Sequence, residues 1–150
     1  MGLTPPGFCA LPLPLVQLSL AAVLKCGQSF RWSIYPLHTS PSPQPFVSID
    51  EYRFCLQDRV VRLRQSSDAL FYRSEFPEEP TDRERCRREL ETLAWIRDYF
   101  QLDVDLSKLY NEWSDRDPVF ARLRTRFKGI RMLRQDPWEN LVSYALLLTW

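Results

Sequence analysis

The residues best suited to chemistry lie in the seven-residue stretch 26–32, CGQSFRW, which combines a thiol, an amide, a hydroxyl, a guanidinium and two aromatic rings. Gly27 has no Cβ, so a flat ligand can approach its main chain and meet the N–H or C=O group directly. If residues 29–34 form a β-strand, Phe30 and Trp32 share one face of it, because side chains alternate with period two. A glycine turn before a core strand explains the same pattern without a ligand.

Other catalytic arrangements find little support. The only histidine, His38, stands in a segment rich in proline, serine and threonine, so a histidine-based dyad is not expected. The sequence has no G-x-x-x-x-G-K-[ST], G-x-S-x-G or H-E-x-x-H motif. Its four cysteines are 17, 29 and 31 residues apart and form no C-x-x-C pair, which argues against a structural zinc site. We therefore predict no catalytic residue, no metal and no cofactor from these patterns.

Length and charge indicate one domain with a solvated charged surface. The chain has 150 residues, of which 45% are hydrophobic, enough for a real core. Its formal net charge is only +1, and acids alternate with bases in the last two-thirds, as on solvated helix faces. The basic run 122–131 could contact phosphates, with Lys128 and Arg131 as candidates, but a solvated helix face explains it equally well.

The N-terminal segment predicts neither export nor membrane insertion. Prolines interrupt its apolar residues at positions 5, 6, 12 and 14, and no basic segment opens it. No run approaches the roughly 18 apolar residues of a membrane-spanning helix. We expect an intracellular protein with reduced thiols and no membrane contact.

Two periodicities predict an α+β fold, an antiparallel sheet followed by a small helical segment. Short alternating runs joined by tight turns indicate a meander, in which Arg62 and Arg64 project from a face that is wet or faces a ligand. A helix over residues 15–25, with Ser19 as N-cap, and a proline-rich loop over 36–50 interrupt the strands. The strands are expected at residues 8–11, 29–34, 52–57, 60–65 and 69–74.

The second half is predicted to be helical from residue 81 onward. Thr81 and Glu84 form a capping box for a helix to about residue 100, whose inner stripe holds Cys86, Leu90, Leu93 and either Ile96 or Arg97. Asp105, Asp117-Pro118 and Asp136-Pro137 begin three more helices, and Gly129 closes the third of the four as its C′ residue, with Phe120, Leu123 and Phe127 facing inward. We divide the chain into residues 1–76, the sheet, and residues 77–150, the start of a helical part.

Three separate motifs together carry a family resemblance. They are GQSFRW at residues 27–32, YFQLDV at 99–104 with Leu109-Tyr110 after it, and GIRMLRQDPWE at 129–139. Over about residues 8–144 the chain resembles the N-terminal half of eukaryotic 8-oxoguanine DNA glycosylase. The resemblance implies a twisted antiparallel sheet like that of TATA-binding protein. It also implies a monomeric nuclear, or mitochondrial, base excision repair protein that flips oxidised guanine out of duplex DNA.

The same resemblance suggests roles for individual residues. The family glycine that matches Gly27 offers its main-chain carbonyl to the N7–H that distinguishes 8-oxoguanine from guanine. Gln28, Phe30, Arg31 and Trp32 would support this pocket or its strand. The basic run 122–131, rather than the resemblance, makes Lys128 and Arg131 candidates for contact with DNA phosphate. The expected partner is double-stranded DNA containing 8-oxoguanine.

The sequence departs from the family after Tyr144. There the family continues into an asparagine-rich segment, whereas this sequence has ALLLTW at residues 145–150. None of Lys25, Lys108 and Lys128 matches the family's nucleophilic lysine, and its catalytic aspartate has no match either. We expect a truncated form that binds damaged DNA weakly or not at all and lacks glycosylase and lyase activity. Two alternatives stay open: the last helix packs back on the earlier ones, or the chain is a non-catalytic DNA- or protein-binding scaffold.

Overall fold

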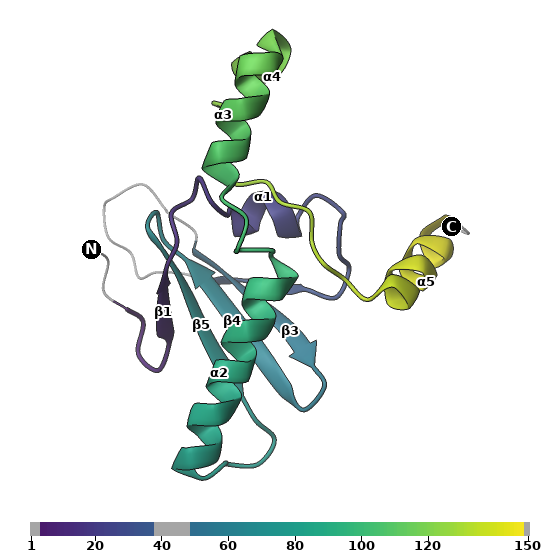
Figure 1. Cartoon of the computed structure of the whole chain (residues 1–150). Helices are drawn as coiled ribbons and strands as arrows, with labels where there is room; N and C mark the ends of the chain where they lie inside the picture. The colour runs from purple at the N-terminus through teal and green to yellow at the C-terminus, as the bar shows by residue number, and fades with distance from the viewer. Residues whose placement is uncertain (1–3, 38–48, 149–150) are drawn as a thin grey trace. The chain divides into compact units, whose positions relative to one another are not determined.

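A computed structural model describes residues 4–37 and 49–148, and shows five antiparallel strands and five helices there (Figure 1). The strands form one sheet in the order β1-β5-β4-β3-β2, so β1 and β2 are its edges. The predicted α+β class is confirmed. The strands are β1 Cys9–Pro12, β2 Ser33–Leu37, β3 Ile49–Leu56, β4 Arg59–Gln65 and β5 Ala69–Glu75; the helices are α1 Leu20–Leu24, α2 Asp82–Tyr99, α3 Leu106–Arg116, α4 Pro118–Leu123 and α5 Pro137–Leu148.

The chain forms two compact units. The first comprises Met1–Leu15 and Arg31–Leu93, and therefore the sheet and the first part of α2. The second comprises Val16–Phe30 and Ala94–Trp150, with the other helices. Strand gives way to helix between Glu75 and Asp82, as the periodicities indicate. The division of the chain at residues 76 and 77 into parts of a glycosylase domain stays a prediction. No helix among the described residues combines the length and apolar character needed to span a bilayer.

One face of the sheet is apolar and is covered by the part of α2 that belongs to the first unit, residues 82–93 (Figure 1). Val61, Leu63 and Leu70 are fully buried on this face. Near the C-terminal end of β5 the contact between β5 and α2 is polar, since the hydroxyls of Ser74 and Thr92 lie 2.8 Å apart. The predicted inner stripe of α2 is confirmed at Ile96, which is fully buried, but is wrong at Leu90, which is 63% exposed, and at Cys86, which is exposed. The polar residue Thr92 is buried instead.

The opposite face of the sheet holds a buried carboxylate. Glu51 of β3 is fully buried and accepts hydrogen bonds of 2.8 Å from each of Arg53, Arg62 and Arg64. Arg62 and Arg64 are mostly buried, with 18% and 22% of their side chains exposed. The prediction that they line a wet or ligand-facing surface is therefore wrong, because both bond the buried Glu51.

Two predicted boundaries near β2 are also wrong. The strand begins at Ser33 and not at Ser29, so Phe30 and Trp32 do not share a strand face: Phe30 is 49% exposed and Trp32 is buried. The predicted loop 36–50 loses both ends, because Pro36 pairs with Asp50 across β2 and β3. A proline fits there since β2 is an edge strand with one unpaired side. The rest of that loop, with His38, lies outside the described residues.

The capping signals place the helix starts correctly. Thr81 and Glu84 form the predicted capping box, and Asp105 and Asp117 each accept two backbone N–H bonds. Ser19 caps α1, which begins at Leu20 and is shorter than the predicted 15–25. The end of α4 is misplaced in the prediction. That helix stops at Leu123, and Gly129, with φ +68°, bends the chain several residues later.

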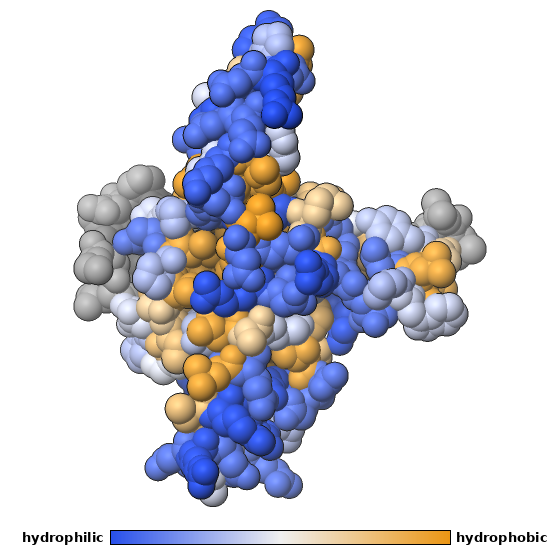
Figure 2. All heavy atoms as spheres, in the orientation of Figure 1, coloured by the Kyte–Doolittle hydropathy of each residue, from blue (hydrophilic) through white to orange (hydrophobic). Residues whose placement is uncertain are grey.

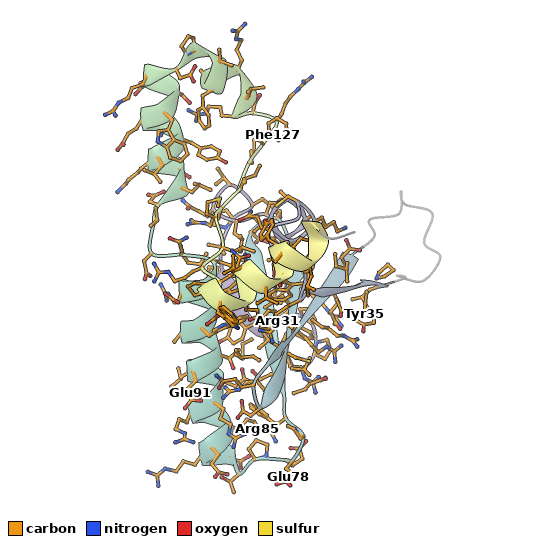
Figure 3. All side chains as sticks on the ribbon, turned by 90° about the vertical axis from the view of Figure 1, so that its right-hand side faces the viewer. Arg31, Tyr35, Glu78, Arg85, Glu91 and Phe127 are labelled. Carbon is orange, nitrogen blue, oxygen red and sulfur yellow. The ribbon has the colours of Figure 1, made fainter. Side chains whose placement is uncertain are left out.

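Some predicted inward positions of the later helices lie on the surface. Leu123 and Phe127 are 44% and 54% exposed, and Phe127 projects from the segment after α4 (Figure 3). The last helix, α5, begins at Pro137 as predicted, and the Asp136 carboxylate accepts the N–H of Glu139. Apolar atoms show on α5 (Figure 2), where Trp138 is 73% exposed. This helix buries little of its apolar surface in the second unit.

The buried Glu51 predicts an acid-sensitive stability. Burial alone would raise the pKa of Glu51, but hydrogen bonds from Arg62, Arg53 and Arg64 outweigh it and lower the pKa from 4.5 to about 2. Because the folded pKa lies below the unfolded one, ionised Glu51 contributes fully above about pH 4.5. That contribution is lost as the pH falls through about 2.

We expect Glu51→Gln to lower the free energy of unfolding by about 3 kcal/mol at pH 7, because it leaves buried arginines without their carboxylate. Urea denaturation between pH 7 and pH 2 measures this loss, which should shrink as the pH falls. The control is Glu91→Gln on α2 (Figure 3), since Glu91 is about half exposed in its 3.1 Å pair with Arg59 and should cost under about 1 kcal/mol. Equal losses in the two variants would contradict the assignment.

Candidate functional site

Gln28 anchors the segment that carries Gly27 to residues 131–135 within the second unit. Its side-chain amide donates to the carbonyl of Arg131 at 3.0 Å and accepts the N–H of Leu133 at 3.1 Å. Its own carbonyl accepts a bond from the Gln135 side chain. These bonds attach the backbone around Gln28 to residues 131–135.

Gly27 stands in a conformation that favours glycine. Its φ is +83°, and a Cβ built there would meet no atom within 4 Å. The main chain is thus exposed on the side where other residues carry a side chain. A flat ligand can approach this backbone, as the sequence suggests.

Ser29 ties the same segment to the end of α2. Its hydroxyl accepts a 3.2 Å bond from the Tyr99 hydroxyl, and both residues are buried. The Tyr99 carbonyl in turn accepts the N–H of Arg134 at 2.8 Å. The three motifs that the sequence places far apart are therefore joined by direct hydrogen bonds in one unit.

Arg131 is buried and donates to neutral oxygens. It is only 5% exposed. Its guanidinium bonds the main-chain carbonyls of Gln17, Gln101 and Val104 and the side-chain oxygen of Gln17. Burial lowers the pKa of Arg131, which the charge of Asp105 partly opposes. Contact of Arg131 with DNA phosphate stays a prediction, and a phosphate would have to compete with these bonds.

Gln17 connects this buried cation to a helix cap. Its side-chain amide donates to Asp105 at 2.7 Å, and its oxygen accepts the N–H of Leu106 at 3.0 Å. Asp105 caps α3 through the N–H groups of Ser107 and Lys108. The hydrogen bond from Gln17, together with those backbone bonds, lowers the pKa of Asp105.

Phe30 and Tyr144 complete this part of the second unit. Their rings meet edge to face with centroids 5.9 Å apart, and both side chains are more than 40% exposed. The Tyr144 hydroxyl donates to the carbonyl of Gly27 at 3.1 Å. The Gly27 carbonyl, which the resemblance predicts to contact the oxidised base, thus lies beside two accessible aromatic rings.

Arg31 and Trp32 belong to the first unit, where they contact β3. Arg31 (labelled in Figure 3) donates to the carbonyl of Cys55 at 2.7 Å, and its guanidinium lies 4.4 Å from the Phe54 ring centroid. Trp32 packs against the same ring, with centroids 5.0 Å apart. These contacts agree with a role in strand support. A pocket role for either residue stays a prediction.

Lys128 lies on the surface near the C-terminal side of α4. It lines a hollow of about 370 Å³ in the second unit, together with Ser107, Asn111, Arg124 and Thr125. Arg124 is held by the Asn111 side chain at 2.9 Å and the Ser114 hydroxyl at 3.0 Å. A phosphate contact by Lys128 stays a prediction that this exposed position permits.

Sequence reasoning missed Gln17, Gln135 and Tyr144 as contributors to the site. Gln17 carried one weak signal, because it is a lone amide among Leu15, Val16 and Leu18. Gln135 and Tyr144 lie within or beside a recognised motif, but nothing local shows that they bond Gln28 and Gly27. All four cysteines are free thiols, and among residues 4–37 and 49–148 no three potential metal ligands cluster.

Comparison with known proteins gives a family match over most of the chain. The family model described as "8-oxoguanine DNA glycosylase, N-terminal domain" matches residues 10–141. An N-glycosylase/DNA lyase of Saccharomyces cerevisiae is 34% identical over 140 residues, which is 91% of this chain and 33% of the yeast protein. The N-glycosylase/DNA lyase OGG1 of Arabidopsis thaliana is 26% identical over 141 residues, or 93% of this chain and 33% of the plant protein. The chain spans about a third of the length of these relatives.

Solved structures share the fold. MBOgg1 in complex with a low affinity DNA ligand superimposes with a TM-score of 0.63 at 24% identity, over 93% of this chain and 39% of that one. The apo-form of Clostridium acetobutylicum 8-oxoguanine glycosylase/lyase gives 0.60 at 23% identity, over 89% and 38% of the two chains. At these identities the likeness establishes the architecture.

The buried guanidinium yields a stability prediction. We expect Arg131→Met to lower the free energy of unfolding by about 3 kcal/mol or more, because it strands the carbonyls of Gln17, Gln101 and Val104 without their donor. Arg134→Met is the matched control, since Arg134 is 61% exposed in its pair with Asp98 and should cost under about 1 kcal/mol. Urea denaturation monitored by tryptophan fluorescence measures both. Similar midpoints for the two variants would show that the buried network contributes nothing special.

Proposed function

Because the chain belongs to the 8-oxoguanine DNA glycosylase N-terminal domain family, we propose that it supplies the damaged-DNA-binding part of such an enzyme and one wall of the pocket for the oxidised base. The observation that carries this proposal is the exposed main chain of Gly27, in a loop held firmly from several directions. A nuclear location, with the mitochondrion as the alternative, follows from a DNA substrate and is part of the same proposal.

The discriminating contact is a hydrogen bond to the carbonyl of Gly27. Oxidation of guanine at C8 places a hydrogen on N7, so 8-oxoguanine donates where guanine presents a lone pair. One carbonyl oxygen can therefore separate the two bases, because it accepts from the first and repels the second. The bonds of Gln28 to residues 131–135 hold this part of the backbone in place.

Binding of the duplex would also draw on surface cations. Lys128 is exposed and follows the basic residues 122, 124 and 126. A lysine that contacts phosphate releases counterions, so its loss weakens binding to all sequences and lowers the salt dependence. Such contacts increase the affinity for DNA of any sequence, and the Gly27 carbonyl provides the preference for the oxidised base.

The 150-residue polypeptide is proposed to bind and not to cleave. The lyase reaction of the family uses a lysine amine that attacks the sugar and forms a Schiff base. Lys25, Lys108 and Lys128 are the only lysines of the sequence, and none matches the family's nucleophile. Lys108 is 80% exposed and lies 3.9 Å from Asp105.

Fluorescence anisotropy with two labelled duplexes tests the binding role. The duplexes differ only in 8-oxoguanine or guanine opposite cytosine. We expect tighter binding of the damaged duplex. Equal affinity for both would remove the base-reading role and favour a general DNA-binding module, and no binding to either would favour the protein-binding scaffold.

Replacement of Gly27 tests the reading group. Gly27→Ala adds a methyl on the side where the base would lie and strains a backbone with φ +83°. We expect about a tenfold loss of preference for the damaged duplex. Gly7→Ala is the control for backbone strain, since Gly7 also has a positive φ, of +73°, but lies in the first unit, where a Cβ would meet the Arg73 guanidinium at 3.0 Å. Loss of preference in both variants, or in neither, would remove Gly27 from the pocket.

Borohydride trapping tests the chemistry. With a duplex containing 8-oxoguanine opposite cytosine, we expect no covalent adduct with the 150-residue polypeptide, because it has no lysine in the family's catalytic position. Gel electrophoresis under denaturing conditions shows the adduct directly. A strong adduct would show that one of the three lysines is a nucleophile, and Lys→Arg variants at each would identify it.

A further inference from the structure

The carbonyl of Gly27 already has a partner within the protein. The hydroxyl of Tyr144, on α5, donates to it at 3.1 Å. The Tyr144 ring stands at 80° to the ring of Phe30, so the hydroxyl is directed by an aromatic contact as well as by its helix. All three residues belong to the second unit, and the contact joins positions 117 residues apart in the chain.

The carbonyl oxygen of Gly27 can accept a second hydrogen bond. A main-chain carbonyl has two lone pairs, which lie near the plane of the peptide group. Tyr144 occupies one of them, and the other stays available to a second donor. The position of the first donor therefore fixes the direction in which a second donor can approach.

The orientation of this carbonyl depends on a backbone that can rotate easily. Glycine populates more of φ/ψ space than any other residue, so the Gly27–Gln28 peptide plane can rotate more easily than its neighbours. Gln28 is fixed through its side chain and its own carbonyl, on the far side of that peptide. The Tyr144 hydroxyl, by contrast, donates its hydrogen bond directly to the Gly27 carbonyl oxygen.

We propose that Tyr144 is a positioning residue that sets the base preference of the site, by holding the Gly27 carbonyl with one lone pair directed toward the base. The inference rests on the proposed function of Gly27 and adds the residue that makes its carbonyl selective. A fixed oxygen repels the N7 lone pair of guanine, whereas a rotating one turns away and tolerates it. A fixed oxygen also spares 8-oxoguanine the entropic cost of ordering the peptide.

Tyr144→Phe is the decisive variant because it removes the hydroxyl and keeps the ring against Phe30. We expect the ratio of affinities for the damaged and undamaged duplexes to fall about three- to tenfold, with weaker binding of the damaged duplex. The control is Tyr35→Phe (Tyr35 is labelled in Figure 3), since Tyr35 is an equally exposed tyrosine, 43% against 43%, on β2 of the first unit. That variant should keep the ratio unchanged.

A measurement without DNA tests the contact itself. The ¹³C resonance of a backbone carbonyl moves downfield when it accepts a hydrogen bond. In the free 150-residue chain, Tyr144→Phe should therefore move the Gly27 carbonyl resonance upfield, and Tyr35→Phe should leave it in place. An unmoved Gly27 resonance in Tyr144→Phe would overturn the proposal.

The binding outcomes separate the two levels of inference. Equal affinity of the unmodified chain for both duplexes overturns the proposed function and the recognition role of Tyr144 with it. A clear preference that Tyr144→Phe leaves unchanged overturns only the role of Tyr144. Stronger binding of both duplexes by Tyr144→Phe also overturns it, because the hydroxyl would then compete with the base for the carbonyl.

Discussion

The second unit depends on a buried positive charge. A guanidinium taken out of water is costly unless its N–H groups find acceptors, and Arg131 meets this demand with three backbone carbonyls and the Gln17 amide. Those acceptors come from the segment before α1 and from the turn between α2 and α3. The charge therefore holds two distant segments of the chain against residues 129–135. The carbonyl of Arg131 in turn accepts a hydrogen bond from the Gln28 side chain.

The site then follows from backbone placement more than from reactive side chains. Gly27 offers a carbonyl, and its neighbours Gln28 and Ser29 are each bonded to a different part of the second unit. Under the proposed function, this carbonyl would discriminate between two bases that differ in one hydrogen, because a single oxygen of fixed direction would decide between attraction and repulsion. Tyr144, on α5, would give that oxygen its direction.

The first unit also buries a charged group, which is bonded by neighbouring side chains. Its sheet has an apolar face under α2 and an opposite face where Arg53, Arg62 and Arg64 converge on Glu51. The three cationic donors compensate the burial of this carboxylate. Arg31 and Trp32 add to this unit by packing on Phe54. The motif of residues 27–32 is thus divided between the units: residues 27–30 belong to the second unit, and Arg31 and Trp32 contact β3 in the first.

The sequence by itself determined what depends on near neighbours. The caps at Ser19, Thr81, Asp105 and Asp117 were correct, because each bonds N–H groups two or three positions away. The strands from residue 52 to 75, the α+β class and the family were equally clear, since alternation and the motifs are local patterns. Only the tertiary structure decided where β2 begins, which face of α2 is buried, and that Arg62 and Arg64 bond a buried Glu51. It alone joined Gln17 to Arg131 and Tyr144 to Gly27, because these partners are over 100 residues apart and are chosen by geometry, which no local pattern records.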